Sequence, residues 1–371
     1  MSYKAEVVEV VMQKHDNADS LSIVKVFDGY TVVVRTEDWL KVPLNNKGQR
    51  LAVFVPPDTI VDSKRPEFSF LQGGERIRAK KLRGVISFGL LVPAPEGAEV
   101  GDDYWDKLGL VHYQPGISQK EKDNYLGGGE VESGPDVYAP KYDLESFHKY
   151  GRRCFSAVER VFVHEKLDGS NCRFVYHNGK MYCGSRTEWK REYANYEHIT
   201  KEFLMSKGQT EDKAEATLEG LSKKSKAQNG WWRLLRENPC IEEFCKANHN
   251  VVLYGEMFGN TNCIKYGFDG PQNRFAAFDL LKSGVWMDWP EALDLLNKFG
   301  VPVAPDVFGG PIEFDFNKIL EATDGNTLVT GAKDGVIREG VVVRAIKECS
   351  SDRIGRHVLK SVSGVFLEKY K

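Results

Sequence analysis

The sequence lacks several features that mark specialised classes of protein. No run approaches the ~18 apolar residues of a membrane span, and the N-terminal MSYKAEVVEVV has no apolar core of signal-peptide length. The seven cysteines form no CxxC pair, and the closest two are Cys240 and Cys245. This odd, unpatterned set argues against a disulfide framework or a zinc site and favours free, buried thiols. We therefore expect an intracellular protein, either cytoplasmic or nuclear.

A GxxxxGK loop is also absent, which argues against a P-loop kinase. The chain has 371 residues, of which 41% are hydrophobic, 11% aromatic and 28% charged. That composition is typical of a soluble globular protein with two or three domains. The formal net charge of −2 neither requires nor excludes a nucleic-acid partner, because local patches matter more than the total.

Short apolar or alternating runs separated by turn-forming residues recur in residues 1–110. The runs predict strands over 5–12, 21–27, 30–35, 51–55 and 86–92. Such regular short strands indicate a small barrel or sandwich. Residues 111–140 are glycine-rich and weakly periodic, and they are the best candidate for a linker.

Residues 141–371 have the pattern of a larger α+β unit. Helices are expected over 143–150 and 290–299, the second stopped by Gly300. A polar stretch around 188–249 has helical spacing and predicts a largely helical insertion. Strands are expected over 160–164, 171–177, 180–183, 250–254, 274–281, 340–346 and 356–361.

The heptapeptide Glu165-Lys166-Leu167-Asp168-Gly169-Ser170-Asn171 places a lysine among acids at the end of a predicted strand. Alone, it could be a solvated charge cluster. Further segments follow it in a fixed order, most of them beside or within predicted strands. They are GSRT at 184–187, LYGE at 253–256, FAAFD at 275–279, REGVVVR at 338–344 and LKS at 359–361. The whole ordered set is hard to assign to chance.

This order resembles the motifs of the covalent nucleotidyltransferase superfamily of ligases and capping enzymes, over residues 141–371. The opening, from Tyr142 to Lys166, looks more like RNA ligases than DNA ligases. Only 11 residues follow Lys360, which leaves no room for the C-terminal OB domain of DNA ligases and capping enzymes. The resemblance implies an α+β fold. A small OB-like β-barrel would precede a nucleotidyltransferase (ATP-grasp-like ligase) domain of antiparallel sheets flanked by helices.

The N-terminal residues 14–21 and 81–90 look similar to OB-type tRNA-binding domains, which supports the same choice. A basic strip would then offer cations to RNA phosphates. Its residues are Arg76, Arg78, Lys80, Lys81 and Arg83. The alternative is a solvated edge strand whose charges block aggregation.

By this resemblance the protein is an RNA ligase that uses ATP and Mg²⁺ or Mn²⁺. It would join RNA 3′-OH and 5′-phosphate ends, with a nicked duplex favoured, and act as a monomer. Lys166 would be the nucleophile, assisted by Asp168 and by Lys360, which would neutralise the α-phosphate. The other expected nucleotide contacts are Glu165, Asn171, Arg186, which would bind the ribose or 5′-phosphate, and Phe278, which would stack on adenine. Glu339 would hold the metal, and Glu256 a ribose hydroxyl or a metal-bound water.

A lysine amine attacks phosphorus only when unprotonated, and its ordinary pKa is roughly 10.4. Neighbouring cations would lower that pKa, and Lys360 and the metal are the candidates. Asp168 would have the opposite effect and hold the ammonium before ATP arrives. Many relatives carry a second lysine where this chain has Val362, so the missing charge must come from elsewhere. The nearby candidates are Lys333, Arg338 and Arg344.

Two alternatives remain open at this point. One is a DNA ligase or a capping-like nucleotidyltransferase. The other is a catalytically inactive RNA-binding protein on a ligase scaffold.

Overall fold

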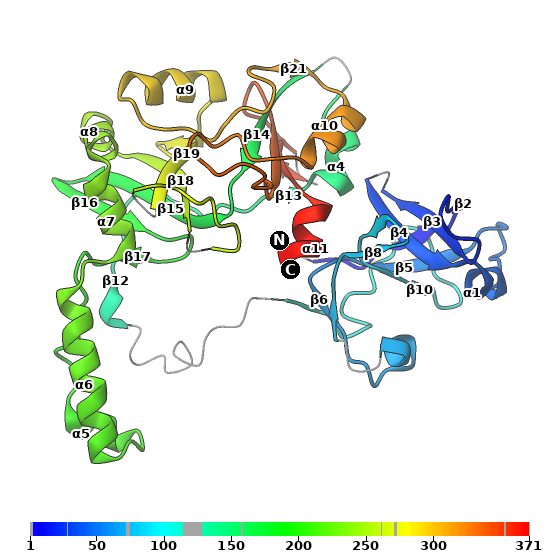
Figure 1. Cartoon of the computed structure of the whole chain (residues 1–371), viewed down its shortest axis with the longest axis horizontal. Helices are drawn as coiled ribbons and strands as arrows, with labels where there is room; N and C mark the ends of the chain where they lie inside the picture. Colours follow the sequence, from blue (N-terminus) through cyan, green and yellow to red (C-terminus); the bar gives the residue numbers. More distant parts are fainter. Residues whose placement is uncertain are drawn as a thin grey trace.

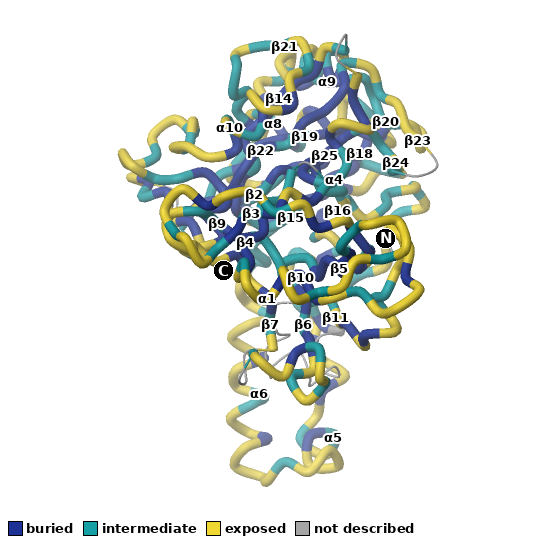
Figure 2. Tube along the Cα trace, turned by 90° about the vertical axis from the view of Figure 1, so that its right-hand side faces the viewer, coloured by how far each residue is buried: buried dark blue, intermediate teal, exposed yellow. Residues whose placement is uncertain are grey.

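The computed structural model describes residues 3–27, 29–71, 75–113, 128–156, 159–260, 262–270, 273–351 and 354–370. A region of short strands, coloured blue to cyan in Figure 1, lies beside a larger unit of sheets and helices. The pair of helices α5 (Lys201–Ser206) and α6 (Glu211–Lys226) projects from the larger unit as an arm, and Figure 2 shows that its surface is mostly exposed. The predicted α+β class is confirmed.

The N-terminal region consists of short antiparallel strands. Its sheets have the orders β1-β5-β10, β2-β3-β4, β11-β6-β7 and β8-β9. The strands are β1 (Val7–Glu9), β2 (Met12–Lys14), β3 (Leu21–Val26), β4 (Tyr30–Arg35), β5 (Leu51–Val55), β6 (Thr59–Ile60), β7 (Arg76–Ile77), β8 (Lys80–Leu82), β9 (Val85–Ser87), β10 (Leu90–Pro93) and β11 (Val111–His112). Between them lie α1 (Thr36–Lys41) and the 3-10 helix η1 (Pro66–Leu71). The strands predicted over 21–27, 30–35 and 51–55 are therefore present, whereas those predicted over 5–12 and 86–92 are each divided between two strands. A closed OB barrel stays a prediction.

The predicted linker 111–140 is partly folded. Strand β11 lies at its start and pairs with β6. At its end, the 3-10 helix η2 (Gly128–Glu130) leads into β12 (Val131–Glu132), which pairs with β17 (Trp189–Lys190) of the larger unit. Residues 114–127 lie outside the described residues. The domain boundaries at 110 and 141 therefore stay predictions.

Within the described ranges, the larger unit contains two main sheets. One has the order β12-β17-β16-β15-β18-β19-β20 and the other β13-β25-β22-β14-β21. Besides β12 and β17, the first sheet contains β15 (Gly169–His177), β16 (Lys180–Gly184), β18 (Val251–Gly259), β19 (Asn273–Lys282) and β20 (Val285–Trp286). The second comprises β13 (Glu145–Ser146), β14 (Arg160–Lys166), β21 (Ile312–Glu313), β22 (Gly340–Ala345) and β25 (Val358–Val362). The hairpin β23 (Ser350–Ser351) and β24 (Gly355–Arg356) connects β22 to β25.

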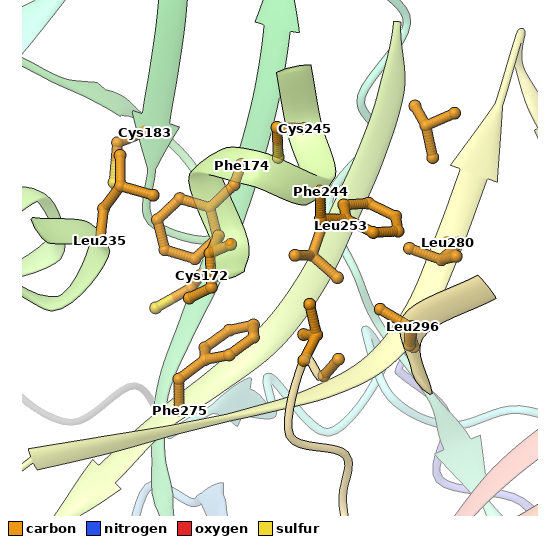
Figure 3. Packing of buried hydrophobic residues seen from close by; sticks show 14 of the residues in the cluster. Cys172, Phe174, Cys183, Leu235, Phe244, Cys245, Leu253, Phe275, Leu280 and Leu296 are labelled. Atoms are coloured by element: carbon orange, nitrogen blue, oxygen red, sulfur yellow. The ribbon is translucent and has the colours of Figure 1, made fainter. Parts of the chain in front are cut away.

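The helices of the larger unit bury its sheets. They are α4 (Phe147–Cys154), α7 (Gly230–Glu237), α8 (Pro239–Ala247), α9 (Trp289–Lys298), α10 (Phe316–Thr323) and α11 (Gly364–Tyr370), besides the arm. Figure 3 shows how Phe174, Leu253 and Leu280 from neighbouring strands meet Leu235 and Phe244 from α7 and α8. Burial of these side chains supplies the main hydrophobic contribution to the stability of this unit.

The predicted helix over 143–150 is wrong at its start. Glu145 and Ser146 form β13, which pairs in parallel with β25, and the helix begins only at Phe147. Pairing with the strand that carries Lys360 thus outweighs the local helical pattern. The predicted helical insertion is present as α5 to α8, and α9 ends before Gly300, which has φ +65°.

The N-terminal region docks against the back of strand β25. The ring nitrogens of His148 contact the Gly29 carbonyl oxygen at 2.8 Å and Ser361 Oγ at 3.1 Å. Tyr30 Oη and Ser146 Oγ lie 2.8 Å apart. Because Ser361 follows Lys360 in the chain, the junction supports the strand that positions that lysine.

The cysteines only partly follow the prediction of buried thiols. Cys154, Cys172, Cys183 and Cys245 are buried thiols and Cys240 is half-buried, whereas Cys263 and Cys349 are exposed. Among the described residues, no helix combines the length and apolar character that crossing a membrane requires.

Candidate active site

A pocket of about 430 Å³ opens between the two main sheets. It is bordered by the ends of β14 and β15 and by β18, β19, β22 and β25. The sequence-predicted residues Glu165, Lys166, Asn171, Arg186, Glu256, Phe278 and Lys360 all line it. Glu339 reaches the same place through a direct contact with Lys166, described next. Folding thus brings together side chains that lie nearly two hundred positions apart in the sequence.

The Lys166 amine forms an ion pair with Glu339. Lys166 Nζ donates a hydrogen bond to Glu339 Oε2 at 2.7 Å. The pair arises because Lys166, the last residue of β14, lies opposite Gly340, the first residue of β22. Gly340 has φ +153°, and a Cβ there would lie 2.0 Å from the Ser361 carbonyl oxygen. Glycine is therefore required where the chain turns from Glu339 into β22.

The surroundings of Lys166 and Lys360 shift the pKa values of these two lysines in opposite directions. Burial lowers the pKa of the Lys166 amine, but the Glu339 and Glu256 carboxylates outweigh burial and leave the pKa above its ordinary value. Burial and the positive charge of Lys166 lower the pKa of Lys360 to about 8. In the free protein, the net effect on Lys166 is therefore the reverse of the lowering predicted from neighbouring cations. The nucleophile candidate is held as an ammonium.

Across the described ranges, two polar side chains of the pocket, Glu256 and Asn171, find no charge or hydrogen-bond partners that fully offset the cost of their burial. Burial raises the pKa of the Glu256 carboxyl to about 8, although the charge of Lys166 opposes that effect. Asn171 lies opposite Glu256 in the β15–β18 pairing, and its Oδ1 is buried without a hydrogen-bond partner among the described residues. An orphaned buried oxygen of this kind is available to a ligand.

Phe278 reaches the pocket through a β-bulge. In the β18–β19 pairing, Tyr254 lies opposite Asp279 but Gly255 lies opposite Ala277, so Phe278 is the extra residue. A bulge redirects the side chains around it. The Phe278 ring lines the pocket 4.7 Å from the Tyr142 ring, centroid to centroid.

A buried ion-pair network behind Phe278 joins the two sheets. Asp279 Oδ2 on β19 accepts hydrogen bonds from Arg344 Nη2 on β22 at 2.8 Å and from Arg356 Nη2 at 2.9 Å. It also accepts one from Tyr142 Oη at 2.7 Å. Burial alone would raise the pKa of Asp279, but the two guanidinium groups hold it below the ordinary value.

Two predicted residues of the heptapeptide have structural partners. The Glu165 carboxylate accepts hydrogen bonds from Thr327 Oγ1 at 2.5 Å and from the Leu328 N–H at 2.6 Å. Asp168 is not among the pocket-lining residues, and its Oδ2 accepts a hydrogen bond from the Ile264 N–H at 2.7 Å. Its charge still contributes to the raised pKa of Lys166. The roles of both residues in nucleotide chemistry remain predictions.

Of the three cations considered as substitutes for a second lysine, only Arg344 lines the pocket within the described part of the chain. Its guanidinium already pairs with Asp279. Arg338 Nε donates to the Asn326 carbonyl oxygen at 3.1 Å, and the Lys333 side chain lies against Gly267. Arg186 lines the pocket and forms an ion pair with Asp143, and it is the better placed cation.

Sequence reasoning missed two aromatic residues of the site. Trp231, from α7 of the insertion, lines the pocket, and its Nε1 donates to the Asn171 carbonyl oxygen at 3.0 Å. Tyr142 lines the opposite part and anchors the Asp279 network. The helical spacing around Trp231 indicated only a core position, so no sequence signal identified it.

A family model described as RNA ligase matches residues 159–362, which is more than half of the chain. The chain belongs to this RNA ligase family. The match includes Lys166, Glu256, Glu339 and Lys360, and the family joins RNA ends. It favours this identity over the alternatives of a DNA ligase or a capping-like enzyme. No curated protein sequence matches the chain.

Solved RNA ligase structures share the fold along nearly the whole chain. A lysine-to-alanine variant of a Naegleria gruberi RNA ligase with ATP and Mn has a TM-score of 0.70 and 20% identity, covering 98% of each chain. The Naegleria gruberi RNA ligase with PPi has a TM-score of 0.69 and 22% identity, covering 100% of this chain and 99% of that one. At these identities the similarity shows the fold alone.

Replacing Asp279 by Asn should lower the free energy of unfolding by about 3–5 kcal/mol, because the buried Arg344 guanidinium loses its counter-charge and Arg356 loses one of its two carboxylate partners. Since the folded pKa of Asp279 lies below the ordinary 3.8, this contribution is fully present above about pH 4 and is lost as the pH falls through the folded pKa. Urea unfolding of the purified protein across this pH range measures both effects. Asp294→Asn, at an exposed site on α9, is the control. Equal destabilisation of the two variants would contradict the account.

Proposed function

We propose that this RNA ligase works through a lysyl-AMP intermediate on Lys166, with ATP as the AMP donor. The observation that carries the proposal is the Lys166 amine, held by Glu339 at 2.7 Å in a pocket between two sheets. Solved relatives support it, because Naegleria gruberi RNA ligase variants hold ATP with Mn and AMP with Mn. Asn171 and Phe278, the orphaned amide and the bulge-directed ring, would contact the nucleotide beside that amine.

The pocket suits a purine nucleotide. The Phe278 ring offers a stacking surface for adenine. Val342 lines the same pocket, and it lies opposite Lys360 in the β22–β25 pairing. A base between Phe278 and Val342 would therefore leave its phosphates on the side of the two lysines. Arg186, at the pocket edge, would contact the ribose or a 5′-phosphate.

The carboxylates around Lys166 fit a divalent cation. Glu339 and Glu256 are hard oxygen donors of the kind that Mg²⁺ and Mn²⁺ prefer. Burial raises the pKa of the Glu256 carboxyl to about 8, so a nearby cation would favour its charged form. A bound Mg²⁺ or Mn²⁺ would supply positive charge against the phosphate oxygens.

The proposed first step exchanges one bond and releases two protons. The Lys166 ammonium first gives up a proton to solvent, and its Nζ lone pair then forms a bond to the α-phosphorus of ATP. The bond to the pyrophosphate oxygen breaks, pyrophosphate leaves, and the second proton of the nitrogen also passes to solvent. Lys360, partly buried, would stabilise the negative charge that develops on the α-phosphate. Asp168 and Glu339 keep the amine charged and in place until ATP enters. AMP then passes to a 5′-phosphate, and a 3′-OH displaces AMP to seal the RNA.

The exposed basic strip of the N-terminal region would hold RNA phosphates. Arg78, Lys80, Lys81 and Arg83 are exposed. Arg76 is partly buried, and it pairs with Asp58 at 2.6 Å and covers the Tyr113 ring. The exposed members of the strip are therefore the better phosphate ligands. As a separate proposal, the favoured substrate is a nicked duplex with RNA on the 3′-OH side, and the protein seals it as a monomer.

Incubation with ATP labelled at the α-phosphate and Mg²⁺ should label the wild-type chain, because AMP stays on the protein through a P–N bond. Lys166→Ala should take up no label, because the amine that would carry AMP is removed. Denaturing gel electrophoresis measures the result. Lys282→Ala, which removes an exposed lysine on β19, is the matched control and should label normally. Label on Lys166→Ala equal to wild type would refute the proposal.

The triple variant Lys80→Ala, Lys81→Ala, Arg83→Ala should bind a nicked RNA duplex more weakly and with a shallower salt dependence. The slope of log affinity against log salt should fall in magnitude by about 0.7–0.9 for each phosphate that the protein no longer neutralises. Uptake of labelled AMP should be unchanged, because the strip takes no part in the first step. The control removes equal charge from the arm with Lys213→Ala, Lys223→Ala and Lys226→Ala. An equal effect of the control would contradict a role specific to the strip.

A further inference from the structure

Glu159, Cys349 and His357 form a cluster of metal-ligand side chains away from the pocket. One ligand atom from each residue lies within 4.8 Å of the other two. Glu159 immediately precedes β14, whereas Lys166 ends that strand. At about 3.3 Å per residue, the cluster lies about 20 Å from the Lys166 end. It is therefore separate from the carboxylates that surround that lysine.

The backbone fixes the three residues that carry these ligands. The His357 N–H donates to the Cys349 carbonyl oxygen at 2.9 Å, and the Phe314 N–H donates to the Glu159 carbonyl oxygen at 2.8 Å. The His357 ring meets the Phe155 ring edge-on, with centroids 6.3 Å apart. Inward rotation of side chains is then the main change needed to bring the ligand atoms together.

One ring nitrogen of His357, Nε2, is buried and lacks a hydrogen-bond partner among the described residues. A buried ring nitrogen without a partner carries a desolvation cost that a bound cation would remove. This second observation points to a ligand independently of the spacing of the cluster.

The chemistry of the three donors selects the metal. A thiolate sulfur, an imidazole nitrogen and a carboxylate oxygen together suit Zn²⁺, whereas Mg²⁺ and Mn²⁺ prefer oxygen donors alone. Zinc–ligand bonds of about 2.0–2.3 Å in tetrahedral geometry place neighbouring ligand atoms about 3.3–3.8 Å apart. Contraction by about 1 Å from the observed spacing would therefore close the site around zinc.

We propose that Glu159, Cys349 and His357 bind one Zn²⁺, which clamps the β23–β24 hairpin to the start of β14. A water molecule completes the coordination, and the Cys349 thiol releases its proton on binding. The sequence argued against a zinc site because these ligands have no local spacing. The cluster forms only when the hairpin folds back on β14. This inference is independent of the lysyl-AMP proposal.

The clamp would also stabilise the pocket. Arg356 precedes His357 and pairs with Glu348, the neighbour of Cys349, at 2.6 Å. The same guanidinium reaches Asp279 at 2.9 Å. Fixing both ends of the hairpin would thus hold the buried network that joins the two sheets.

The test is metal content of the full-length protein after incubation with Zn²⁺ and removal of excess by gel filtration. Wild type should retain about one zinc per chain, as expected for a site with three protein ligands. Cys349→Ser and His357→Ala should each lose most of it. Cys263→Ser and His198→Ala remove an exposed thiol and an exposed imidazole elsewhere and should keep it. Glu339→Gln should also keep it, which separates this site from the Lys166 carboxylates.

Cobalt provides a second measurement that does not depend on the stability of the His357 variant. Co²⁺ added to wild type should give a thiolate charge-transfer band in the near ultraviolet, and Cys349→Ser should lack that band while keeping the wild-type circular dichroism spectrum. Equal zinc content in wild type and Cys349→Ser would overturn the proposal.

Discussion

The contact between the Lys166 amine and the Glu339 carboxylate is the interaction on which the rest of the site depends. It places a positive charge in the pocket, where the Lys166 side chain is 25% exposed and burial is outweighed by the Glu339 and Glu256 carboxylates, which raise its pKa. Burial and, in turn, the charged amine lower the pKa of the neighbouring Lys360. The ion pair keeps the amine in place and protonated until a nucleotide changes the balance of charge.

The contact itself lies within one sheet, because β14 and β22 are paired, but the pocket around it depends on the spacing of the two sheets, since Glu256 and Phe278 belong to the other sheet. The buried Asp279–Arg344 pair joins the sheets directly at 2.8 Å. Breaking such a pair is costly, although its net contribution to stability can be small. We attribute to it a positional role, because Tyr142 and Arg344 in this network also line the pocket. The N-terminal region adds support from behind β25 through His148.

Much of the site could be predicted from the sequence because its residues sit in short segments at or within strands, in an order that resembles a known superfamily. Lys166, Glu256 and Lys360 meet in one pocket as that order implied. The direction of the Lys166 pKa could not be predicted, because it depends on which charges come within a few ångströms after folding. Phe278 lines the pocket, but the bulge that directs it depends on strand register, which the sequence pattern does not fix.

The remaining errors have the same origin in tertiary structure. Residues 145–146 were expected in a helix but pair with β25, and part of the expected linker joins sheets of both regions. Trp231 enters the pocket from an insertion whose helical spacing indicated only core packing. The fold class was predictable because alternating strands and amphipathic helices are local signals. Contacts between distant segments are not local, so they appeared only in the structure.

A crystal structure with an unreactive ATP analogue and Mg²⁺ tests the central claim most directly. We expect the nucleotide between Phe278 and Val342, with Lys166 Nζ about 3–3.5 Å from the α-phosphorus, a distance suited to attack. The amine should no longer be within hydrogen-bond distance of Glu339. A nucleotide bound elsewhere, or an α-phosphorus facing another nucleophile while Lys166 stays paired with Glu339, would contradict that claim.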